Sequence, residues 1–507
     1  MNFFYSFIPE IFLSFAILFQ LVFNAAFISN SKNNYPVLNK ELISQILFIL
    51  FCLLLLYSNL KVEGSFFNNL FINDENTRLV KIFCVMIYFL ITPILFENYK
   101  SNKLSFFEYF SLIFFSLFSL LLLISSSDML SAYLLIEVQA LSFYVLASFK
   151  RNSSFGTEAS FKYFVSGSFI SGIFLLGCSL LYGLLGTLNF NSLYLLLSIP
   201  FGSNNFIFLC ILNFSFILIT STFLFKLSAA PFHFWSPDVY EGSSLSSTVV
   251  FAILPKLAIF NFLIRWLLVL NNNFLSIKLL LLISGVLSVV LGTVFSLYQK
   301  RLKRFIIFSS IAQTGFLISC LSVITINSLT AVYFFLIIYL LTSILIWSNF
   351  SFAQIWNSKT IKFYNYSENS LFLSSLANYF KFNSLWYFSF ILIFFSLAGI
   401  PPLSGFFAKI FILFSLISEK LIAFASLLIF ISAVSVFYYL RILKIMGFES
   451  NNSLKSINNS QVVYASQTFF LTSSIVSFLL FLLLYIFFYP IDFLLLSQYT
   501  TLSLFSL

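Results

Sequence analysis

Long apolar runs, separated by short polar segments, occupy almost the whole sequence. A helix needs roughly 20 apolar residues to cross the hydrocarbon core of a bilayer. By this rule about fourteen membrane-spanning helices are predicted, at residues 3–28, 42–60, 79–96, 105–124, 128–149, 160–185, 205–231, 244–269, 275–298, 305–325, 328–352, 385–417, 421–447 and 463–489. The first run lacks a basic leading region and a cleavage site, so it is expected to be a span and not a signal peptide. Only 8% of the residues are charged, against about 25% in soluble domains, so the sequence predicts an all-α integral membrane protein.

The basic residues are distributed unevenly between the predicted loops. With the N-terminus placed outside, odd-numbered loops hold 16 Lys and Arg residues, among them Lys303 and Arg304. Even-numbered loops hold 6, among them Arg78, Lys81 and Arg265. Because inside loops are enriched in Lys and Arg, both termini are predicted to lie outside. The net charge of +10 forms no basic arm or helix face, so no nucleic-acid partner is expected.

Residues that could hold a cofactor are scarce. The five cysteines lie at least 32 residues apart, and His233 is the only histidine. This spacing is not typical of a zinc or iron–sulfur site, and no Gly-rich phosphate loop is present. We therefore expect no metal and no redox cofactor in this chain.

Ionisable residues inside the predicted spans carry the functional prediction. Glu137 lies in the fifth span, Lys226 in the seventh, Lys256 in the eighth and Lys409 in the twelfth, while Lys162 lies at the edge of the sixth. A charge at the centre of a bilayer costs roughly 2.5–3.5 kcal/mol on insertion scales, so such residues usually pair, line water or transport ions. One glutamate could form an ion pair that only orients helices, but it cannot neutralise three lysines. The surplus favours a chain of titrating groups.

Prolines interrupt two of the spans that carry a lysine. Pro231 follows Lys226 by five residues, and Pro401 and Pro402 precede Lys409 by eight and seven. Proline removes a backbone donor and clashes with the preceding turn, and broken helices with buried charge mark ion sites in transporters. A simple kink is the alternative for each proline. We predict broken seventh and twelfth helices.

Three polar residues follow the first break. His233 lies seven residues after Lys226, and it could serve as a proton relay or as an interfacial histidine bonded to a backbone carbonyl. Asp238 and Glu241 are expected to cap or anchor the turn that follows.

A faint internal repeat divides the chain. Phe161-Lys162-Tyr163-Phe164 is similar to Leu302-Lys303-Arg304-Phe305. We predict two five-helix units in an inverted repeat, within four segments: an N-terminal three-helix segment at 1–104, the first unit at 105–270, the second unit at 271–447 with a polar insertion at about 353–384, and a C-terminal helix and tail at 448–507.

The order and spacing of several motifs between about residues 105 and 445 resemble those of the NADH dehydrogenase subunit 2 family. The fifth-span motif is Asp128-Met-Leu-Ser-Ala-Tyr-Leu-Leu-Ile-Glu137-Val-Gln-Ala-Leu-Ser-Phe-Tyr-Val-Leu-Ala. The longest motif is Phe225-Lys226-Leu-Ser-Ala-Ala-Pro231-Phe-His233-Phe-Trp235-Ser-Pro-Asp238-Val-Tyr-Glu241-Gly242, followed by Pro255-Lys256. Further matches are Thr157–Phe164, Lys303–Gly315 and Ala398–Lys409. This family is one of three antiporter-like subunits in the membrane arm of respiratory complex I.

The resemblance implies a role for each charged residue. Glu137 would pair with Lys226, the switching lysine at the first break, while Lys256 would be the central relay and Lys409 the terminal lysine. Lys162 matches a further family lysine. The implied activity is proton translocation coupled to NADH:ubiquinone oxidoreduction.

The resemblance also implies a setting for the chain. FMN, iron–sulfur clusters and ubiquinone would bind to other subunits, and the partners would be neighbouring membrane-arm subunits and lipids such as cardiolipin. The mitochondrial inner membrane is the expected location, ahead of a bacterial plasma membrane. Three alternatives remain open: a stand-alone cation/proton antiporter subunit, a non-conducting scaffold and a polytopic membrane enzyme.

Overall fold

The structure of the chain is a computed structural model. It describes residues 7–28, 35–58, 64–101, 108–150, 153–198, 206–270, 275–360, 372–376, 384–448 and 467–505. Most of the predicted insertion at about 353–384 lies outside the described residues, although α14 continues into its first part as far as Thr360.

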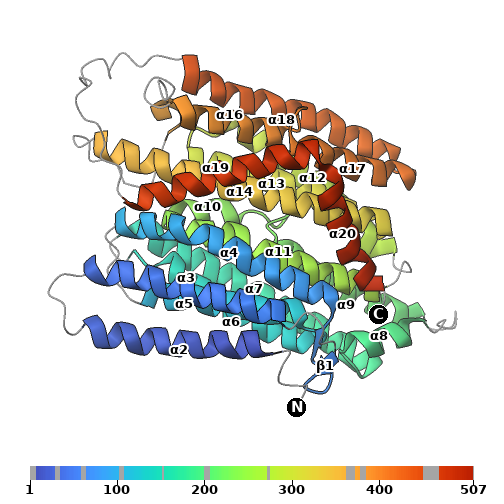
Figure 1. The fold of residues 1–507 in the computed structure, drawn as a ribbon. Helices are drawn as coiled ribbons and strands as arrows, with labels where there is room; N and C mark the ends of the chain where they lie inside the picture. Colours follow the sequence, from blue (N-terminus) through green and yellow to red (C-terminus); the bar gives the residue numbers. More distant parts are fainter. Residues whose placement is uncertain are drawn as a thin grey trace.

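Helices make up nearly all of the described chain. Figure 1 shows them side by side in one bundle, with the N-terminal helices at one edge and α18 at the opposite edge. In chain order they are α2 (Ile8–Ile28), α3 (Tyr35–Ser58), α4 (Glu75–Ser101), α5 (Glu108–Ser125), α6 (Met129–Ala147), α7 (Ser154–Leu185), α8 (Phe190–Ser198), α9 (Phe206–Lys226), α10 (Trp235–Gly242), α11 (Leu245–Val269), α12 (Leu275–Tyr298), α13 (Leu302–Leu321), α14 (Ile326–Thr360), η2 (Leu373–Leu376), α16 (Ser384–Ala398), α17 (Ser404–Ser418), α18 (Ile422–Phe448), α19 (Gln467–Phe488) and α20 (Pro490–Phe505).

Among the described residues, ten helices are long and apolar enough to cross a membrane. A bent pair, α19 and α20, meets the same test as one unit with an angle of 89° between its halves. Four shorter apolar helices lie in α2, α3, α16 and α17. The chain is thus a multi-pass membrane protein, while the count of fourteen spans stays a prediction.

Both predicted helix breaks are present. α9 ends at Lys226, and turns occupy the segment up to Trp235, where α10 begins. α16 ends at Ala398 and α17 begins at Ser404. A residue with a left-handed backbone stands in each break: Ser228 with φ 56° and Gly399 with φ 77°. Glycine adopts this conformation without steric cost.

Several elements differ from the sequence prediction. An antiparallel hairpin of β1 (Gly64–Phe66) and β2 (Phe71–Asn73) stands in the predicted loop before the third span. α7 begins before the predicted residue 160, and α14 extends past 352. α8 was not predicted, and the residues predicted as a tail form α20. A short helix such as α8 contains too few apolar residues to cross a bilayer, so a rule based on bilayer thickness does not detect it.

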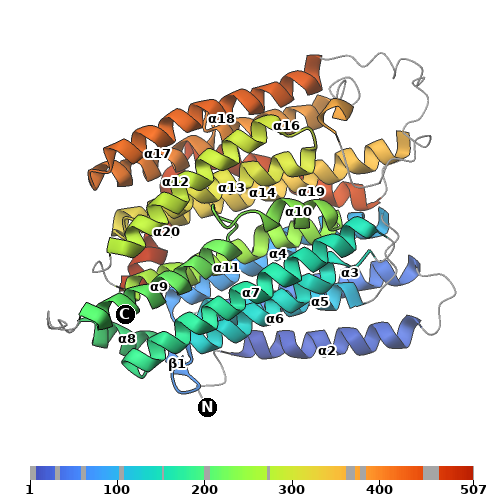
Figure 2. The ribbon, with the colours of Figure 1, turned by 180° about the vertical axis from the view of Figure 1, so that it is seen from behind.

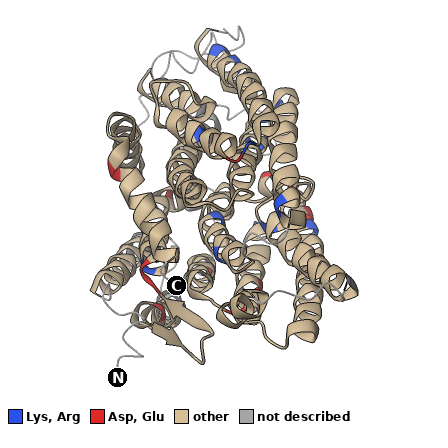
Figure 3. Cartoon of the chain, turned by 90° about the vertical axis from the view of Figure 1, so that its right-hand side faces the viewer, with Lys and Arg blue, Asp and Glu red and all other residues tan. Residues whose placement is uncertain are grey.

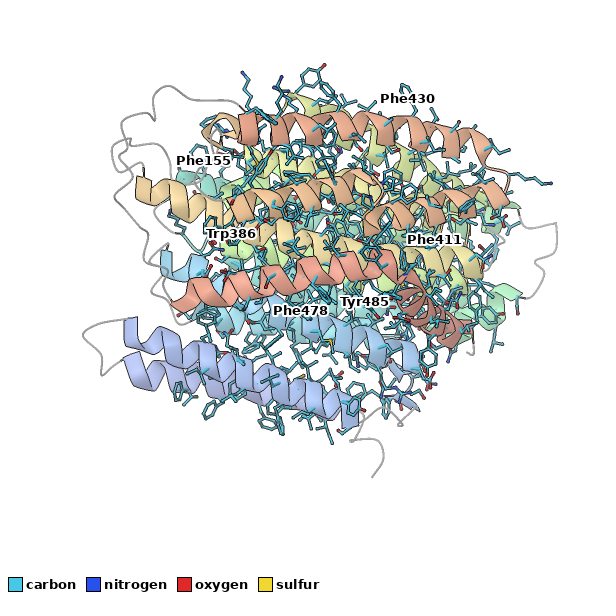
Figure 4. The ribbon with its side chains drawn as sticks, turned by 45° about the horizontal axis from the view of Figure 1, so that its top comes forward. Phe155, Trp386, Phe411, Phe430, Phe478 and Tyr485 are labelled. Atoms are coloured by element: carbon cyan, nitrogen blue, oxygen red, sulfur yellow. The ribbon has the colours of Figure 1, made fainter. Side chains whose placement is uncertain are left out.

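The centre of the bundle is α11. It packs against α4, α5 and α14, and each residue of its apolar stretch is buried. The outer helices α7 and α18 bury only 28% of theirs, and Figure 2 shows α7 on the near side of the bundle. Phe430 of α18, labelled in Figure 4, points outward. α11 is therefore shielded from lipid, whereas α7 and α18 present apolar side chains to it.

Candidate functional site

The first break places Lys226 at the C-terminal end of α9 and near Glu137 of α6. The charge of Glu137 acts on Lys226, but among the described residues no ion-pair contact joins the two side chains. Both side chains are only partly buried, and Oε1 of Glu137 has no hydrogen-bond partner in the described chain. The two groups therefore interact through space without being locked together.

Neutral groups hold the backbone at this break. The Nε1 of Trp235 donates a hydrogen bond of 3.0 Å to the carbonyl oxygen of Phe225, one residue before Lys226. The ring of Trp235 stacks on Tyr163 of α7, with 4.9 Å between ring centroids. The same carbonyl accepts a 2.9 Å hydrogen bond from the backbone N–H of Ser228, so the indole is a second donor to this helix end.

His233 lies inside the break and is buried. Its ring lies beside the backbone of Pro231, and its Nδ1 has no partner among the described residues. The backbone neighbour fits an interfacial histidine. The nitrogen without a partner fits a proton relay, so the structure is compatible with both predictions.

Lys256 lies in α11 immediately after a helix-internal proline. Because Pro255 has no N–H, the carbonyl of Phe251 four residues earlier is left free. The hydroxyl of Tyr240 in α10 donates to that carbonyl at 3.2 Å. Lys256 itself is buried and donates to the hydroxyl of Tyr339 in α14. α10, the helix after the first break, thus donates a hydrogen bond to the α11 backbone near Lys256.

Lys409 points into the second break. Its Nζ donates a 2.8 Å hydrogen bond to the carbonyl of Ala398, the last residue of α16. It also lies 5.5 Å from the ring centroid of Phe316. The Nε2 of Gln313 donates to the neighbouring carbonyl of Leu397 at 3.1 Å. Polar side chains of α13 and α17 therefore satisfy the carbonyls that this break frees.

A small cavity lies beside Lys409 and Tyr339. Tyr339, Gln313 and Lys409 are among the residues that line it, and it leaves about 10 Å³ for the centre of a water molecule. A volume of this size holds about one water. Tyr339 accepts from Lys256 and also lines this cavity, so one hydroxyl side chain contacts Lys256 and adjoins the cavity that Lys409 lines.

Lys162 is not part of this buried group. Its side chain is 45% exposed on α7 and forms ion pairs with Glu158 at 2.7 Å and Asp238 at 2.9 Å. Asp238 also pairs with Arg304 at 3.2 Å, and Glu241 pairs with Arg301 and Arg304. Asp238 and Glu241 thus anchor α10 to the start of α13, as expected for a turn anchor.

The assignment of some basic residues to loops was wrong. Lys303 is buried in the first turn of α13 and donates to the carbonyl of Ser243 at 3.0 Å. Lys81 is buried in α4 and pairs with Glu10 of α2 at 2.5 Å. Arg265 is buried in α11 and pairs with Asp74 at 3.3 Å. Figure 3 shows several such basic residues inside the bundle. These charges lie near the ends of spans. There the sequence does not distinguish a loop residue from a buried residue of the helix.

The acidic groups were also undercounted. Besides Glu137, Glu10 and Glu97 are buried, and Glu97 accepts a hydrogen bond from Thr472. Both lie outside the two predicted five-helix units, in α2 and α4. Within the described residues, no three His, Cys, Asp or Glu side chains come together as a metal-ligand set.

Comparisons with known proteins agree on one family. The family model for the transmembrane region of NADH:quinone oxidoreductase/Mrp antiporter proteins matches residues 126–435. NADH-ubiquinone oxidoreductase chain 2 of Marchantia polymorpha is 34% identical over 454 residues, covering 87% of this chain and 88% of that protein. NADH-quinone oxidoreductase subunit N of Pelagibacter ubique is 32% identical over 465 residues, covering 91% and 93%.

Solved structures share the fold. A chain of respiratory complex I from Thermus thermophilus superposes with a TM-score of 0.73 at 22% identity, covering 95% of this chain and 97% of that chain. A chain of the Mrp complex from Dietzia sp. superposes with a TM-score of 0.77 at 17% identity, covering 99% and 97%.

Proposed function

The chain belongs to the NADH:quinone oxidoreductase/Mrp antiporter family of membrane proteins, and from this premise we propose that it is a proton-translocating subunit in the membrane arm of respiratory complex I. In that role it couples NADH:ubiquinone oxidoreduction in other subunits to proton movement through Glu137, Lys226, Lys256 and Lys409.

The absence of fixed counter-ions at the lysines supports this proposal. Among the described residues, Lys226, Lys256 and Lys409 form no ion-pair contact. The partners of the last two are a tyrosine hydroxyl and a backbone carbonyl. A charge in a low-dielectric site interacts strongly with every neighbouring charge. Glu137 acts on Lys226 without touching it, and among the described residues no carboxylate contacts Lys256 or Lys409. Their charge can therefore respond to a charge that changes elsewhere.

The proposed sequence of events begins at Glu137. When the distance between Glu137 and Lys226 changes, the field at Lys226 changes with it, and Lys226 loads or releases a proton. The proton passes toward Lys256 and, through Tyr339 and the small cavity, toward Lys409. His233 lies inside the first break and is a candidate relay. Lys162 would act from the surface, through its pair with Asp238.

The finer architecture belongs to the same proposal. α2 and α3 each cross the membrane, α16 and α17 together form one broken span, and the bent pair α19–α20 accounts for another. With the ten longer helices, these make the fourteen predicted spans. The helices α5–α11 and α12–α18 form the two units of the inverted repeat, each with one break.

We place the chain in the mitochondrial inner membrane; plants and fungi have relatives named NADH-ubiquinone oxidoreductase chain 2. FMN, iron–sulfur clusters and ubiquinone bind to other subunits, and the partners are the neighbouring antiporter-like subunits and lipids such as cardiolipin.

The test replaces Lys226 with Ala, and Glu137 with Ala, in the assembled complex reconstituted into vesicles. Proton uptake is measured together with NADH oxidation. We expect the rate of proton transport to fall by about tenfold or more, since a positioned proton-transfer group contributes at least that much. Full assembly with unchanged transport would favour a scaffold. Cation flux by the isolated chain in liposomes would favour a stand-alone antiporter.

A further inference from the structure

A second series of buried polar side chains begins at Lys256 and follows α11 toward its C-terminal end. Asn261 and Arg265 are five and nine residues beyond Lys256, which places them about 7.5 and 13.5 Å farther along the helix axis at 1.5 Å per residue. Both are buried. This series leads away from Lys409 and toward the end of the bundle that carries the β1–β2 hairpin (Figure 1).

Side chains from three other helices complete the series. The hydroxyl of Tyr333 in α14 donates to Oδ1 of Asn261 at 2.8 Å. The Nδ2 of Asn76 in α4 donates to that hydroxyl at 3.2 Å, and to the carbonyl of Thr500 in α20 at 3.0 Å. Tyr339, which binds Lys256, lies six residues after Tyr333 on the same helix. We call Tyr339, Tyr333, Asn261 and Asn76 the polar file.

Two polar atoms of the polar file lack a hydrogen-bond partner in the described chain. Within the described chain, Nδ2 of Asn261 and Oδ1 of Asn76 have no hydrogen-bond partner, although both residues are completely buried. An unpaired buried polar group is costly, and ordered water supplies the partner for most such groups in proteins. Water bound at these two atoms would supply their partners and extend the file on either side of the Tyr333 hydroxyl.

An ion pair stands at the outer end. Arg265 contacts Asp74 at 3.3 Å, with 6% and 16% of the two side chains exposed. Asp74 lies directly after β2 and before α4, at the surface of the bundle. A permanent guanidinium charge opposes the passage of a proton, and the carboxylate of Asp74 offsets this charge. The pair is therefore placed where it would control release and limit backflow.

We propose that the polar file is a proton path between Lys256 and the membrane face at the hairpin, with Arg265 and Asp74 as its gate. The proton leaves Nζ of Lys256, moves along the hydroxyls of Tyr339 and Tyr333 and the water between them, and is released beside Asp74. Each hydroxyl takes up a proton on one side as it gives up its own on the other, so its net charge does not change, while the amides of Asn261 and Asn76 hold the water by hydrogen bonds. This path rests on the proposed function, because Lys256 must first receive a proton.

Two substitutions at one residue separate conduction from packing. In the assembled complex, Asn261→Leu fills the site with an apolar side chain of similar size and blocks water. Asn261→Ser leaves room for a water and keeps a hydroxyl. If the file conducts, protons moved per NADH oxidised should fall several-fold in the Leu variant and be largely retained in the Ser variant. If the file only packs helices, the Ser variant should show the larger loss of stability, because the smaller side chain leaves a cavity.

A matched control and a reference variant complete the test. Asn349→Leu removes another fully buried asparagine, which also has an unpaired Oδ1 in the described chain and bonds Ser389 across two helices. It should leave the proton ratio unchanged. Lys256→Ala reports on the proposed function itself. A low ratio in Lys256→Ala with a normal ratio in Asn261→Leu would overturn the polar file alone, and normal ratios in both would overturn the proposed function as well.

Discussion

The two helix breaks carry the same residue type but hold it in opposite ways. At the first break Lys226 is partly exposed, and in the described chain it makes no hydrogen bond and no ion-pair contact; the charge that acts on it comes from Glu137 on another helix. At the second break Lys409 is buried and donates to the carbonyl that the break itself frees. At the first break the carbonyl of Phe225 accepts from neutral groups only, the backbone N–H of Ser228 and the indole of Trp235.

This difference separates the two lysines by what determines their charge. Lys409 is held by backbone and amide dipoles that are fixed parts of the fold. Lys226 has no such contact, and the charge that acts on it belongs to Glu137, whose Oε1 has no partner in the described chain. In the proposed function the first break would respond to a change at Glu137, and the second would keep a constant environment.

The largest expected effect tests how tightly the second break is packed. A Cβ on Gly405 would overlap the backbone carbonyl of Ser396, which no rotamer change can relieve. We expect Gly405→Ala to lower the free energy of unfolding by about 3 kcal/mol, the upper part of the usual range for overpacking. The measurement is the fraction of complex that survives heating. Gly183→Ala is the control, because a Cβ there has no neighbour within 4 Å; equal survival of the two variants would mean that the break is loosely packed.

An intermediate effect tests the roles of the two lysines. Lys409→Met removes the donor to Ala398 and leaves a buried carbonyl unpaired, which costs about 1–3 kcal/mol. Lys226→Met removes no hydrogen bond that the described chain contains, so its stability should not fall. Thermal unfolding should separate the two variants although both lose proton transport. Equal losses of stability would remove the distinction between a fixed and a responsive lysine.

The smallest effect concerns the indole at the first break. Trp235→Phe keeps the ring stack on Tyr163 and loses the hydrogen bond to Phe225. We expect a loss of about 1 kcal/mol, the net value of one neutral hydrogen bond. Trp266→Phe is the control, because the buried Nε1 of Trp266 has no partner in the described chain. If both variants lose the same stability, the hydrogen bond to Phe225 contributes nothing beyond ring volume.

The sequence predicted the helical class, both breaks and the lysines near them. These features have strong local causes: long apolar runs, proline without an N–H, and charges in the middle of a span. Apolar runs indicate which residues are removed from water, but not which side chains contact each other. The side chains that donate hydrogen bonds to the backbone at the breaks could therefore not be predicted in this way. Trp235, Tyr240, Gln313 and Tyr339 are aromatic or polar residues whose partners come from other helices.

Two kinds of error have physical causes. Lys81 and Lys303 were assigned to loops because each lies within a turn or two of a helix start, where a neighbour such as Glu10 decides burial. α8 and α20 were not predicted because α8 is too short to span, and α20 turns sharply from α19 after Tyr489 (Tyr485 marks the region in Figure 4). Tertiary packing, which a single sequence does not contain, determines both.

The complete enclosure of α11 has a consequence for how such chains diverge. A substitution in a helix that packs against protein along its length requires compensating substitutions in the neighbouring helices. α7 and α18 bury only 28% of their apolar stretches, so there one exposed apolar side chain can replace another. Phenylalanine supplies 75 residues of this chain and occurs in both settings: Phe251, Phe260 and Phe262 are buried in α11, whereas Phe430 of α18 is exposed. Replacing one of the three would require its neighbours to change, and replacing Phe430 would not.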